Sequence, residues 1–491
     1  MDNLIRAGAV EVVGRLAAGE VTPDELLDAL SARIATVDPV VNALPTLCWD
    51  RARRARPAAP LHGLPVAVKD LSATAGVRTS YGSPIFANHI PDADDHVVAR
   101  IEARGGAIYA KTNTPEFGAG AQTFNPVFGV TRNPWNTALT PAGSSGGSAV
   151  ALKTGMAWLA HGSDFAGSLR NPASFCGIVG LRPSVGRVPS GPGADPWGSL
   201  WAEGPMARSV ADVALFLDAL SGQDMREPLS LADPGLSFLG AAQAPRLPAR
   251  VAYSADLGGI TPVDPEIARI TEAAARRLER LGVAVEAASP DFTGAHDCFQ
   301  TLRALGCATD HAEKLTAHPG MIKADLVWNI EKGLALTGEQ IAAALRARGA
   351  IMARVRAFFE TYDLLLCPAT IVPPFPVEQR YVESCAGHRF ETYVDWLAIA
   401  YAITLTGHPA LSLPCGFTAA GLPVGVQMVG RWQGEAGLLA QAAALESELG
   451  LDPAPIDPRP AVPAVRGPDD TGSFAPEALT GRPVSRPTAG S

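Results

Sequence analysis

The sequence predicts an α/β fold: a single large α/β/α domain around a mixed, mostly parallel, twisted sheet. Three observations lead to this prediction. Short apolar runs alternate with longer segments of helical periodicity, which is typical of βαβ units. The chain has 491 residues, 47% of them hydrophobic, so it can bury a large core. No linker divides it before the end of a last helical segment, so one domain is expected over residues 1–451.

The first 60 residues are predicted to form N-terminal helices. Thr22, Pro23 and Glu25 have the pattern of a capping box with proline at the first helical position. Leu26, Leu30 and the residues that follow at helical spacing then share one apolar face. A helix therefore begins at Pro23.

Two buried strands are predicted next. Residues 64–68 and 107–110 are short apolar runs, and they end at Lys69 and Lys111. A helix at 95–104, closed by Gly105 and Gly106, lies between them. Strand, helix and strand at this spacing favour a parallel pair.

The later part of the chain alternates in the same way. Residues 132–207 are rich in Gly, Ser and Pro, the residue types typical of turns and loops, around one short predicted helix. Residues 292–360 are predicted to be mainly helical. The Pro/Gly-rich tail at 452–491 is expected to be loosely attached or disordered. The predicted strands are 250–253, 283–285, 362–368, 410–414 and 424–429, and the predicted helices are 148–154, 209–220, 265–281 and 435–449.

Composition excludes several function classes. The net charge of -9 argues against a nucleic-acid groove, and no apolar run is long enough to span a membrane. The seven cysteines are odd in number and form no C-x-x-C pair, as expected for a reduced, cytoplasmic chain without a zinc knuckle. Only six of the 40 basic residues are lysines, the type that can lose its proton when buried.

Two segments rich in glycine and serine, residues 141–149 and 162–173, stand out as candidates for chemistry. Such runs are usually flexible connectors, but these two flank apolar segments inside the domain. Serine hydroxyls near a base can act as nucleophiles, and the N–H groups of a tight glycine turn can stabilise an oxyanion. The pattern therefore indicates nucleophilic acyl transfer.

At these positions the chain resembles the amidase signature family. The resemblance is carried by A-G-S-S-G-G-S at 142–148, G-S-D-F-A-G-S-L-R at 162–170 and L-P-V-A-V-K-D at 64–70. Ser144 follows Lys69 by 75 positions and Ser168 follows Ser144 by 24, separations that are similar to the family's. Further similar blocks lie at 111–117, 204–209 and 421–427, so the resemblance covers roughly residues 5–450.

The resemblance implies a catalytic triad and the family's fold. Ser168 would be the nucleophile, Ser144 the bridging serine after a cis peptide from Gly143, and Lys69 the neutral base. The implied oxyanion hole is the set of N–H groups of Phe165, Ala166, Gly167 and Ser168. Residues implied to support the site or bind substrate are Gly143, Ser145, Asp164, Arg170 and Asn113. Region 292–400 is expected to determine substrate specificity.

The chain departs from the family pattern at two glycines. Ala142 replaces the first glycine of the first block, and Ala166 replaces the first glycine of the turn before Ser168. A Cβ at position 166 is tolerated only if the φ angle there is negative. We expect Ala166 to change specificity rather than to abolish activity, because all three triad positions are present.

The expected function is hydrolysis of the C–N bond of a small or medium amide. Carbamates (urethanes), anilides and esters pass through the same tetrahedral intermediate. The resemblance implies no metal and no organic cofactor, and we expect no nucleic-acid or membrane partner and a monomer or homodimer. One alternative is the glutaminase subunit of a tRNA-dependent amidotransferase, which would hydrolyse glutamine and pass ammonia to partner subunits.

Two further alternatives come from other classes. The G-x-S-x-G at 143–147 is also the motif of a Ser-His-Asp esterase, although the preceding residues are poor strand material. A catalytically silent binding protein is the other, and the complete triad argues against it. Arg170 is expected to hold a loop by an ion pair, and His161 to have a core or loop role.

Overall fold

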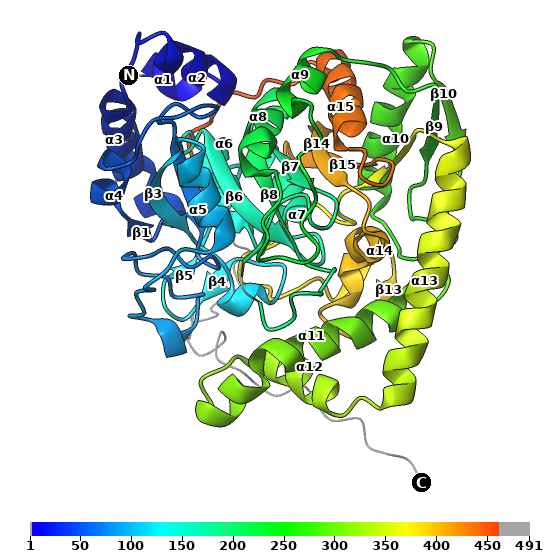
Figure 1. Ribbon diagram of the computed structural model, residues 1–491. Coiled ribbons are helices and arrows are strands. Elements are labelled where there is room, and N and C mark those ends of the chain that lie inside the picture. The colour runs from blue at the N-terminus through cyan, green and yellow to red at the C-terminus, as the bar shows by residue number, and fades with distance from the viewer. Residues whose placement is uncertain (1, 192, 461–491) are drawn as a thin grey trace, which may run out of the picture.

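The computed structural model describes residues 2–191 and 193–460, and one mixed sheet of eleven strands runs through them (Figure 1). The strands lie in the order β1-β3-β2-β6-β8-β7-β14-β15-β11-β9-β10. The predicted α/β class is confirmed. Their bounds are β1 Thr46–Leu47, β2 Pro65–Lys69, β3 Ala107–Thr112, β6 Leu159–Asp164, β7 Val179–Arg182, β8 Ala202–Ala207, β9 Arg250–Tyr253, β10 Ala284–Ala287, β11 Leu364–Pro368, β14 Ala410–Phe417 and β15 Pro423–Val429.

The sheet is mixed, as expected, but the prediction that it is mostly parallel is wrong, because four of its described strand pairs are parallel and six are antiparallel. Parallel pairs form two groups, β3-β2-β6 on one side and β11-β9-β10 on the other. Between them, β6, β8, β7, β14, β15 and β11 pair antiparallel. The small sheets β4 Phe124–Asn125 with β5 Gly129–Val130, and β12 Ser384–Cys385 with β13 His388–Arg389, lie in loops.

The predicted helices form close to their expected bounds. Thr22 and Glu25 make the capping box of α3 Pro23–Val41, and Ser209 caps α8 Val210–Leu220 by accepting from the Asp212 N–H. The other helices of the first half are α1 Asp2–Arg6, α2 Ala9–Ala17, α4 Trp49–Arg53, α5 His96–Ala103, α6 Gly146–Lys153, α7 Arg170–Cys176 and α9 Phe238–Gln243.

The second half adds a helical layer beside the sheet. The helices α11 Ala295–Ala317, α12 Ala324–Leu334 and α13 Gly338–Thr361 lie below and along one side of the sheet in Figure 1. Helix α11 packs on both α12 and α13, and α11 and α13 also pack on α14 Ala398–Thr406. The remaining helices, α10 Pro265–Arg280 and α15 Glu435–Leu449, pack together on β14 and β15. No helix in the described ranges is long and apolar enough to cross a membrane.

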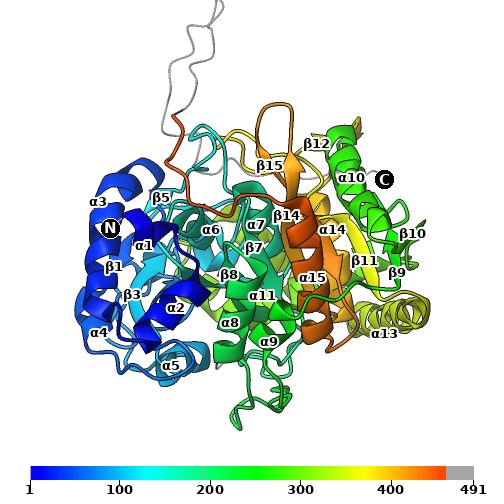
Figure 2. The same cartoon turned by 90° about the horizontal axis from the view of Figure 1, so that it is seen from above.

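The sequence predicts a loosely attached chain after α15, and for residues 452–460 this is wrong. The segment runs from α15 back across the molecule (Figure 2). Asp457 forms an ion pair of 2.6 Å with Arg33, and the Ile456 N–H donates to the Lys153 carbonyl at 2.8 Å. Residues 461–491 lie outside the described residues.

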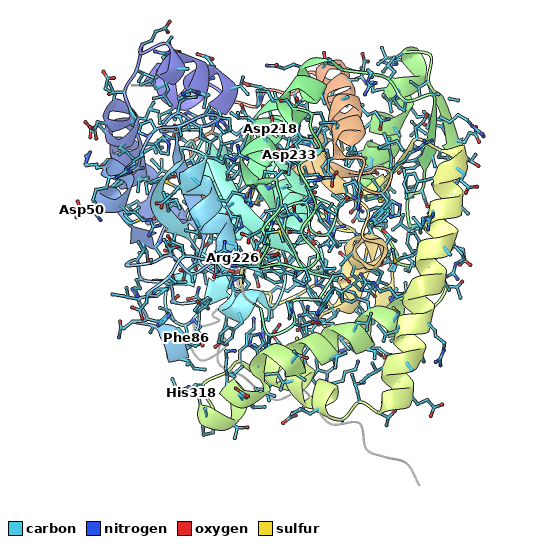
Figure 3. All side chains as sticks on the ribbon, viewed as in Figure 1. Asp50, Phe86, Asp218, Arg226, Asp233 and His318 are labelled. Carbon is cyan, nitrogen blue, oxygen red and sulfur yellow. The ribbon has the colours of Figure 1, made fainter. Side chains whose placement is uncertain are left out.

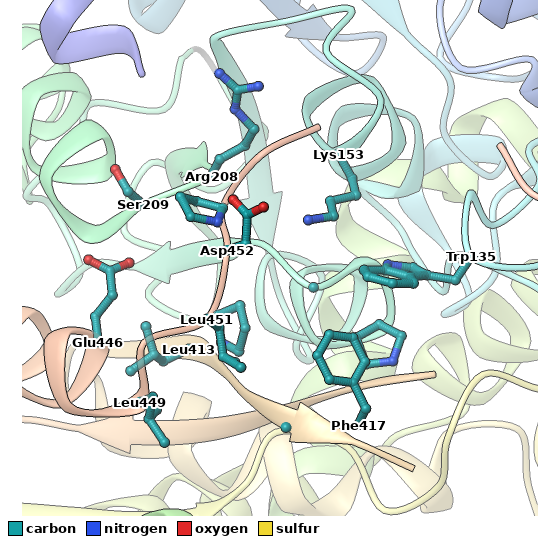
Figure 4. Close-up of a pocket in the computed structure, with 15 residues that line it drawn as sticks. Trp135, Lys153, Arg208, Ser209, Leu413, Phe417, Glu446, Leu449, Leu451 and Asp452 are labelled. Carbon is teal, nitrogen blue, oxygen red and sulfur yellow. The ribbon is translucent and has the colours of Figure 1, made fainter. Parts of the chain in front are cut away.

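This C-terminal segment also closes a cavity of about 190 Å³ (Figure 4). The cavity lies between the end of α6, the β14–β15 hairpin and α15. None of the predicted catalytic residues lines it. Its walls include Trp135, Lys153, Arg208, Phe417, Glu446 and Asp452.

Candidate active site

Lys69 is the last residue of β2, a strand that is buried along its whole length between β3 and β6. Its side chain is fully buried. Lys69 Nζ lies 2.7 Å from Ser144 Oγ, 2.9 Å from Ser145 Oγ and 3.0 Å from Ser163 Oγ. The amine is therefore surrounded by hydroxyl groups.

This environment favours the neutral amine. Burial lowers the pKa of Lys69 to about 7, because an ammonium ion loses its hydration there, while the carboxylates of Glu203 and Asp164 oppose the shift. Near neutral pH a substantial fraction of Lys69 is unprotonated and can accept a proton. Arginine could not do this at the same position.

Ser144 and Ser145 occupy the loop immediately before α6. The peptide bond between Gly143 and Ser144 is cis, as the resemblance implies. The Ser145 hydroxyl donates to the Ser163 carbonyl at 3.2 Å and accepts from the Ser163 N–H at 3.3 Å. Ser145 thus ties the serine loop to β6.

Ser168 lies in the turn between β6 and α7 and is half-buried. Its carbonyl accepts a hydrogen bond of 3.3 Å from the Ser145 N–H, so the two serine-bearing loops lie side by side. Lys69, Ser144 and Ser168 therefore come from three separate segments that meet at the ends of β2 and β6.

The turn at 165–168 is shaped by Asp164. This carboxylate accepts from the N–H of Gly167 at 2.9 Å and of Leu169 at 3.1 Å. The Gly167 N–H is therefore already engaged. The N–H groups of Phe165, Ala166 and Ser168 remain as the candidates for an oxyanion hole.

The two departures from the family pattern differ in backbone conformation. Ala166 lies outside the left-handed region, so its Cβ is tolerated, and the positive φ angle of the turn falls on Gly167 at 106°. Ala142, in contrast, has a φ of 61°, a conformation that favours glycine. The strained replacement is thus Ala142 rather than Ala166.

Arg170 forms a buried ion pair with Asp164. Its Nη2 and Nε lie 2.9 and 3.0 Å from the two carboxylate oxygens, and its other donors reach the Ala400 carbonyl and the side chains of Thr404 and Gln427. Burial alone would raise the pKa of Asp164, but the charges of Arg170 and Arg182 hold it well below its ordinary range. Arg170 is therefore fully buried, and Asp164 neutralises its charge. This is the arrangement expected of a residue that holds a loop by an ion pair.

Asn113 lies at the end of β3 and supports loops. Its amide group donates to Thr131 Oγ1 at 2.9 Å and accepts from the N–H of Thr114 and from the Asn125 side chain. None of these partners is a predicted catalytic residue. Asn113 therefore acts on the packing of neighbouring loops.

The sequence did not point to Ser163 or to Glu203. Ser163 supplies the third hydroxyl around the amine, and His161 Nε2 lies 2.8 Å from the carboxylate of Glu203. His161 and Ser163 are two positions apart in β6, and residues two apart in a strand lie on the same face of the sheet. A strand predicted there from the sequence would therefore have grouped these two side chains. His161 thus has the core role expected of it.

The Ser-His-Asp alternative does not fit this arrangement. It requires a strand directly before the serine of G-x-S-x-G, whereas no strand occurs within residues 131–145. The serine in question, Ser145, contacts Lys69. Across residues 2–191 and 193–460 there is also no group of three or more His, Cys, Asp or Glu side chains placed to hold a metal ion.

Comparison with known proteins gives the same family. The amidase family model matches residues 25–439. The chain is 33% identical over 461 residues to an acylamidase of Rhodococcus erythropolis, covering 91% of this chain and 96% of the relative. It is 36% identical over 466 residues to the A-type component of the glutamyl-tRNA(Gln) amidotransferase of Thermus thermophilus, covering 89% and 96%.

Solved structures are also similar over nearly the whole chain. A 6-aminohexanoate cyclic dimer hydrolase complexed with substrate has a TM-score of 0.84 and 28% identity, with 92% of this chain and 98% of that chain covered. A bacterial aryl acylamidase of the amidase signature family has a TM-score of 0.83 and 26% identity, with 90% and 96% covered. The chain therefore belongs to the amidase signature family and is an amide-hydrolysing enzyme.

Proposed function

We propose that this enzyme cleaves the C–N bond of a small or medium amide through an acyl-enzyme on Ser168, with Ser144 and Lys69 as the proton relay. The observation that carries the proposal is the buried Lys69 amine 2.7 Å from Ser144 Oγ, in surroundings that favour its neutral form. Carbamates, anilides and esters are further substrates, because they share the tetrahedral intermediate.

Attack begins at the Ser168 hydroxyl. Its oxygen forms a bond to the substrate carbonyl carbon while its proton passes to Ser144 Oγ, and the Ser144 proton passes to Lys69 Nζ. The carbonyl electron pair moves onto oxygen. N–H groups of Phe165, Ala166 and Ser168 then stabilise the oxyanion.

Collapse of the intermediate runs the relay in reverse. The carbonyl re-forms, the C–N bond breaks, and the proton on Lys69 returns through Ser144 to the leaving nitrogen. Water then attacks the Ser168 ester by the same relay and releases the acid. The three side chains supply base, relay and nucleophile, so the cycle is complete without a metal or an organic cofactor.

We propose that residues 1–451 form the catalytic unit and that region 292–400 selects the substrate. The enzyme is proposed to act in the cytoplasm as a monomer or homodimer. Helices α11 and α12 belong to that region. Helix α11 approaches the site through Phe299, whose ring centroid lies 5.8 Å from that of Phe165 in the turn before Ser168.

A second candidate is a glutaminase that passes ammonia to partner proteins, favoured by the 36% identity to the A-type component of an amidotransferase. Ala166 at the turn favours a stand-alone hydrolase. Glutaminase activity that rises when the other amidotransferase components are added would favour the second candidate. Activity on simple amides that is unaffected by those components would favour the first.

The test of the mechanism is Ser168→Ala assayed on aryl amides, fatty amides, carbamates and esters. We expect kcat/KM to fall roughly 10⁴-fold or more on every substrate, because nucleophile and relay act as a unit. Ser31→Ala, an exposed serine on α3, is the matched control and should keep full activity. Hydrolysis retained by Ser168→Ala would refute the assignment of the nucleophile.

A further inference from the structure

Arg303 on α11 is a buried cation without a carboxylate partner among the described residues. It is 7% exposed and takes part in no ion pair in that part of the chain. Its Nη2 donates to the Tyr393 hydroxyl at 2.9 Å, while its buried Nε has no hydrogen-bond partner. Buried charges are normally paired, so this guanidinium has unused capacity for an anion.

Lys323, the half-buried residue before α12, is a second cation without an ion pair in the described ranges. Its Nζ donates to the Ala119 carbonyl and lies 3.5 Å from the position that a Cβ on Gly120 would occupy. No carboxylate in the described ranges forms an ion pair with it. Burial lowers the pKa of Lys323 to about 8, with Asp325 and Glu116 opposing, so the amine is largely protonated at neutral pH.

Both cations border the proposed catalytic site. A Cβ placed on Gly118 would lie 3.5 Å from Ser144 Oγ, and Lys323 reaches the same loop two residues on. The Arg303 guanidinium carbon lies 5.7 Å from the centre of the Phe165 ring, three residues before Ser168. The two positive groups thus flank the side of the site that α11 and α12 provide.

The contrast with Arg170 supports a role in binding rather than in holding a loop. Arg170 also lies near Ser168, but the Asp164 carboxylate neutralises its charge. Its guanidinium N–H groups donate to Asp164 and to the Ala400 carbonyl. The Arg303 guanidinium carbon instead lies 5.7 Å from the ring centres of both Phe165 and Tyr393. Aromatic rings attract a guanidinium without neutralising its charge.

We propose that the substrate is an amide carrying a carboxylate remote from the scissile bond, and that Arg303 and Lys323 bind this carboxylate. The inference rests on the proposed amide hydrolysis at Ser168. A guanidinium binds a carboxylate through two parallel hydrogen bonds, and a nearby ammonium adds a third. The rings of Phe165, Trp201 and Phe299 contact the hydrocarbon or aryl portion that separates the carboxylate from the amide.

The test compares matched anilides with and without an acid group. N-phenylsuccinamate and N-phenylbutanamide differ by a terminal carboxylate on the acyl chain, and 4-acetamidobenzoate and acetanilide differ by one on the ring. We expect wild-type kcat/KM to favour the acid member of one pair at least tenfold. Arg303→Gln should lower that value about 10–100-fold, mainly through KM, and leave the neutral member within about twofold.

Control variants separate this role from loss of folding. Arg303→Lys keeps the charge and should retain part of the preference, Lys323→Met should lose part of it, and Arg269→Gln, an exposed arginine on α10, should change nothing. Binding of the acid anilide to Ser168→Ala, with and without Arg303→Gln, reports the contact without turnover. Equal loss on both members of a pair, or no acid preference in the wild type, would overturn the proposal, whereas failure of Ser168→Ala to lose activity would overturn the mechanism beneath it.

Discussion

At the scale of single residues, Lys69 and Lys111 show how surroundings decide chemistry. Both lie on neighbouring strands of the sheet and both are fully buried. Burial lowers the pKa of Lys111, and the Asp70 carboxylate at 3.8 Å opposes this shift. Lys69 faces three hydroxyls instead. Of two lysines that look alike after apolar runs, Lys69 is therefore the one whose amine contacts a predicted catalytic serine, whereas the Lys111 amine donates to Ser72, Thr74 and Thr79.

The pH profile tests the protonation state of Lys69. We expect kcat/KM to rise with pH and level off, with a midpoint near the Lys69 pKa of about 7, because only the unprotonated amine accepts a proton. The Glu203 carboxylate raises this pKa, so Glu203→Gln should move the midpoint to lower pH. The measurement is kcat/KM from pH 5 to 9.

Two variants calibrate that measurement. Glu11→Gln removes an exposed carboxylate on α2 and should leave the midpoint unchanged. Lys69→Met should be inactive at every pH. A midpoint that moves upward in Glu203→Gln would contradict the stated role of this carboxylate.

At the scale of elements, the strands around the Ser168 turn are the ones that the sequence does not predict. β6, β7 and β8 contain glycine, proline or polar residues. They lie within residues 132–207, where the sequence predicts mainly turns and loops. Glycine is needed because neighbouring backbone approaches closely. A Cβ on Gly180 would lie 2.4 Å from the Leu169 carbonyl oxygen at the start of α7, and one on Gly204 would lie 2.3 Å from the Leu181 carbonyl oxygen of β7. The packing that positions Ser168 thus removes the apolar side chains by which a strand is recognised.

The turn between β6 and α7 gives a matched pair of variants. Gly167→Ala should lower kcat/KM at least tenfold and also lower the Tm, because φ is 106° there and a Cβ would lie 2.5 Å from Asn171 Oδ1. Ala166→Gly should stay within about threefold of wild type, because the φ angle at this position already suits alanine. Thermal melts and anilide kinetics check both. Equal tolerance of the two changes would refute this account of the turn.

At the scale of the whole molecule, one sheet joins segments from Thr46 to Val429, and the chain after α15 returns across it. Exposed charged side chains such as Asp50, Arg226 and Asp233 cover the outside (Figure 3). The returning segment meets α3 through Arg33 and α6 through Lys153. Residues 452–460 therefore connect the end of the described chain to helices α3 and α6.

Truncation tests this link. A chain ending at residue 450 loses the ion pair of Asp457 with Arg33 and the hydrogen bond from Ile456 to Lys153, and it opens the cavity in Figure 4. We expect it to be less stable by about 2–4 kcal/mol, from a few hydrogen bonds and some apolar burial. A chain ending at residue 460 is the matched control, because it keeps every described contact. Equal Tm values for the two chains would contradict the role of this segment.

The sequence by itself determined the fold class, the long helices and the outer strands. Periodicity, caps and apolar runs are local signals, and they place the start of α3 and both ends of α10, β9 and α15 to within a residue or two. The spacing of Lys69, Ser144 and Ser168, read through a family resemblance, also picked out the side chains that now stand as the proposed triad.

Only the tertiary structure decided how those side chains are surrounded. In the structure the Gly167 N–H donates to Asp164, and the positive φ angle falls on Ala142 rather than on Ala166. Ser163 joins the neighbours of Lys69. The tertiary structure also neutralised Arg170 and left Arg303 without a carboxylate among the described residues. The physical reason is that charge, burial and close approach depend on groups far apart in the chain, which no local pattern brings together.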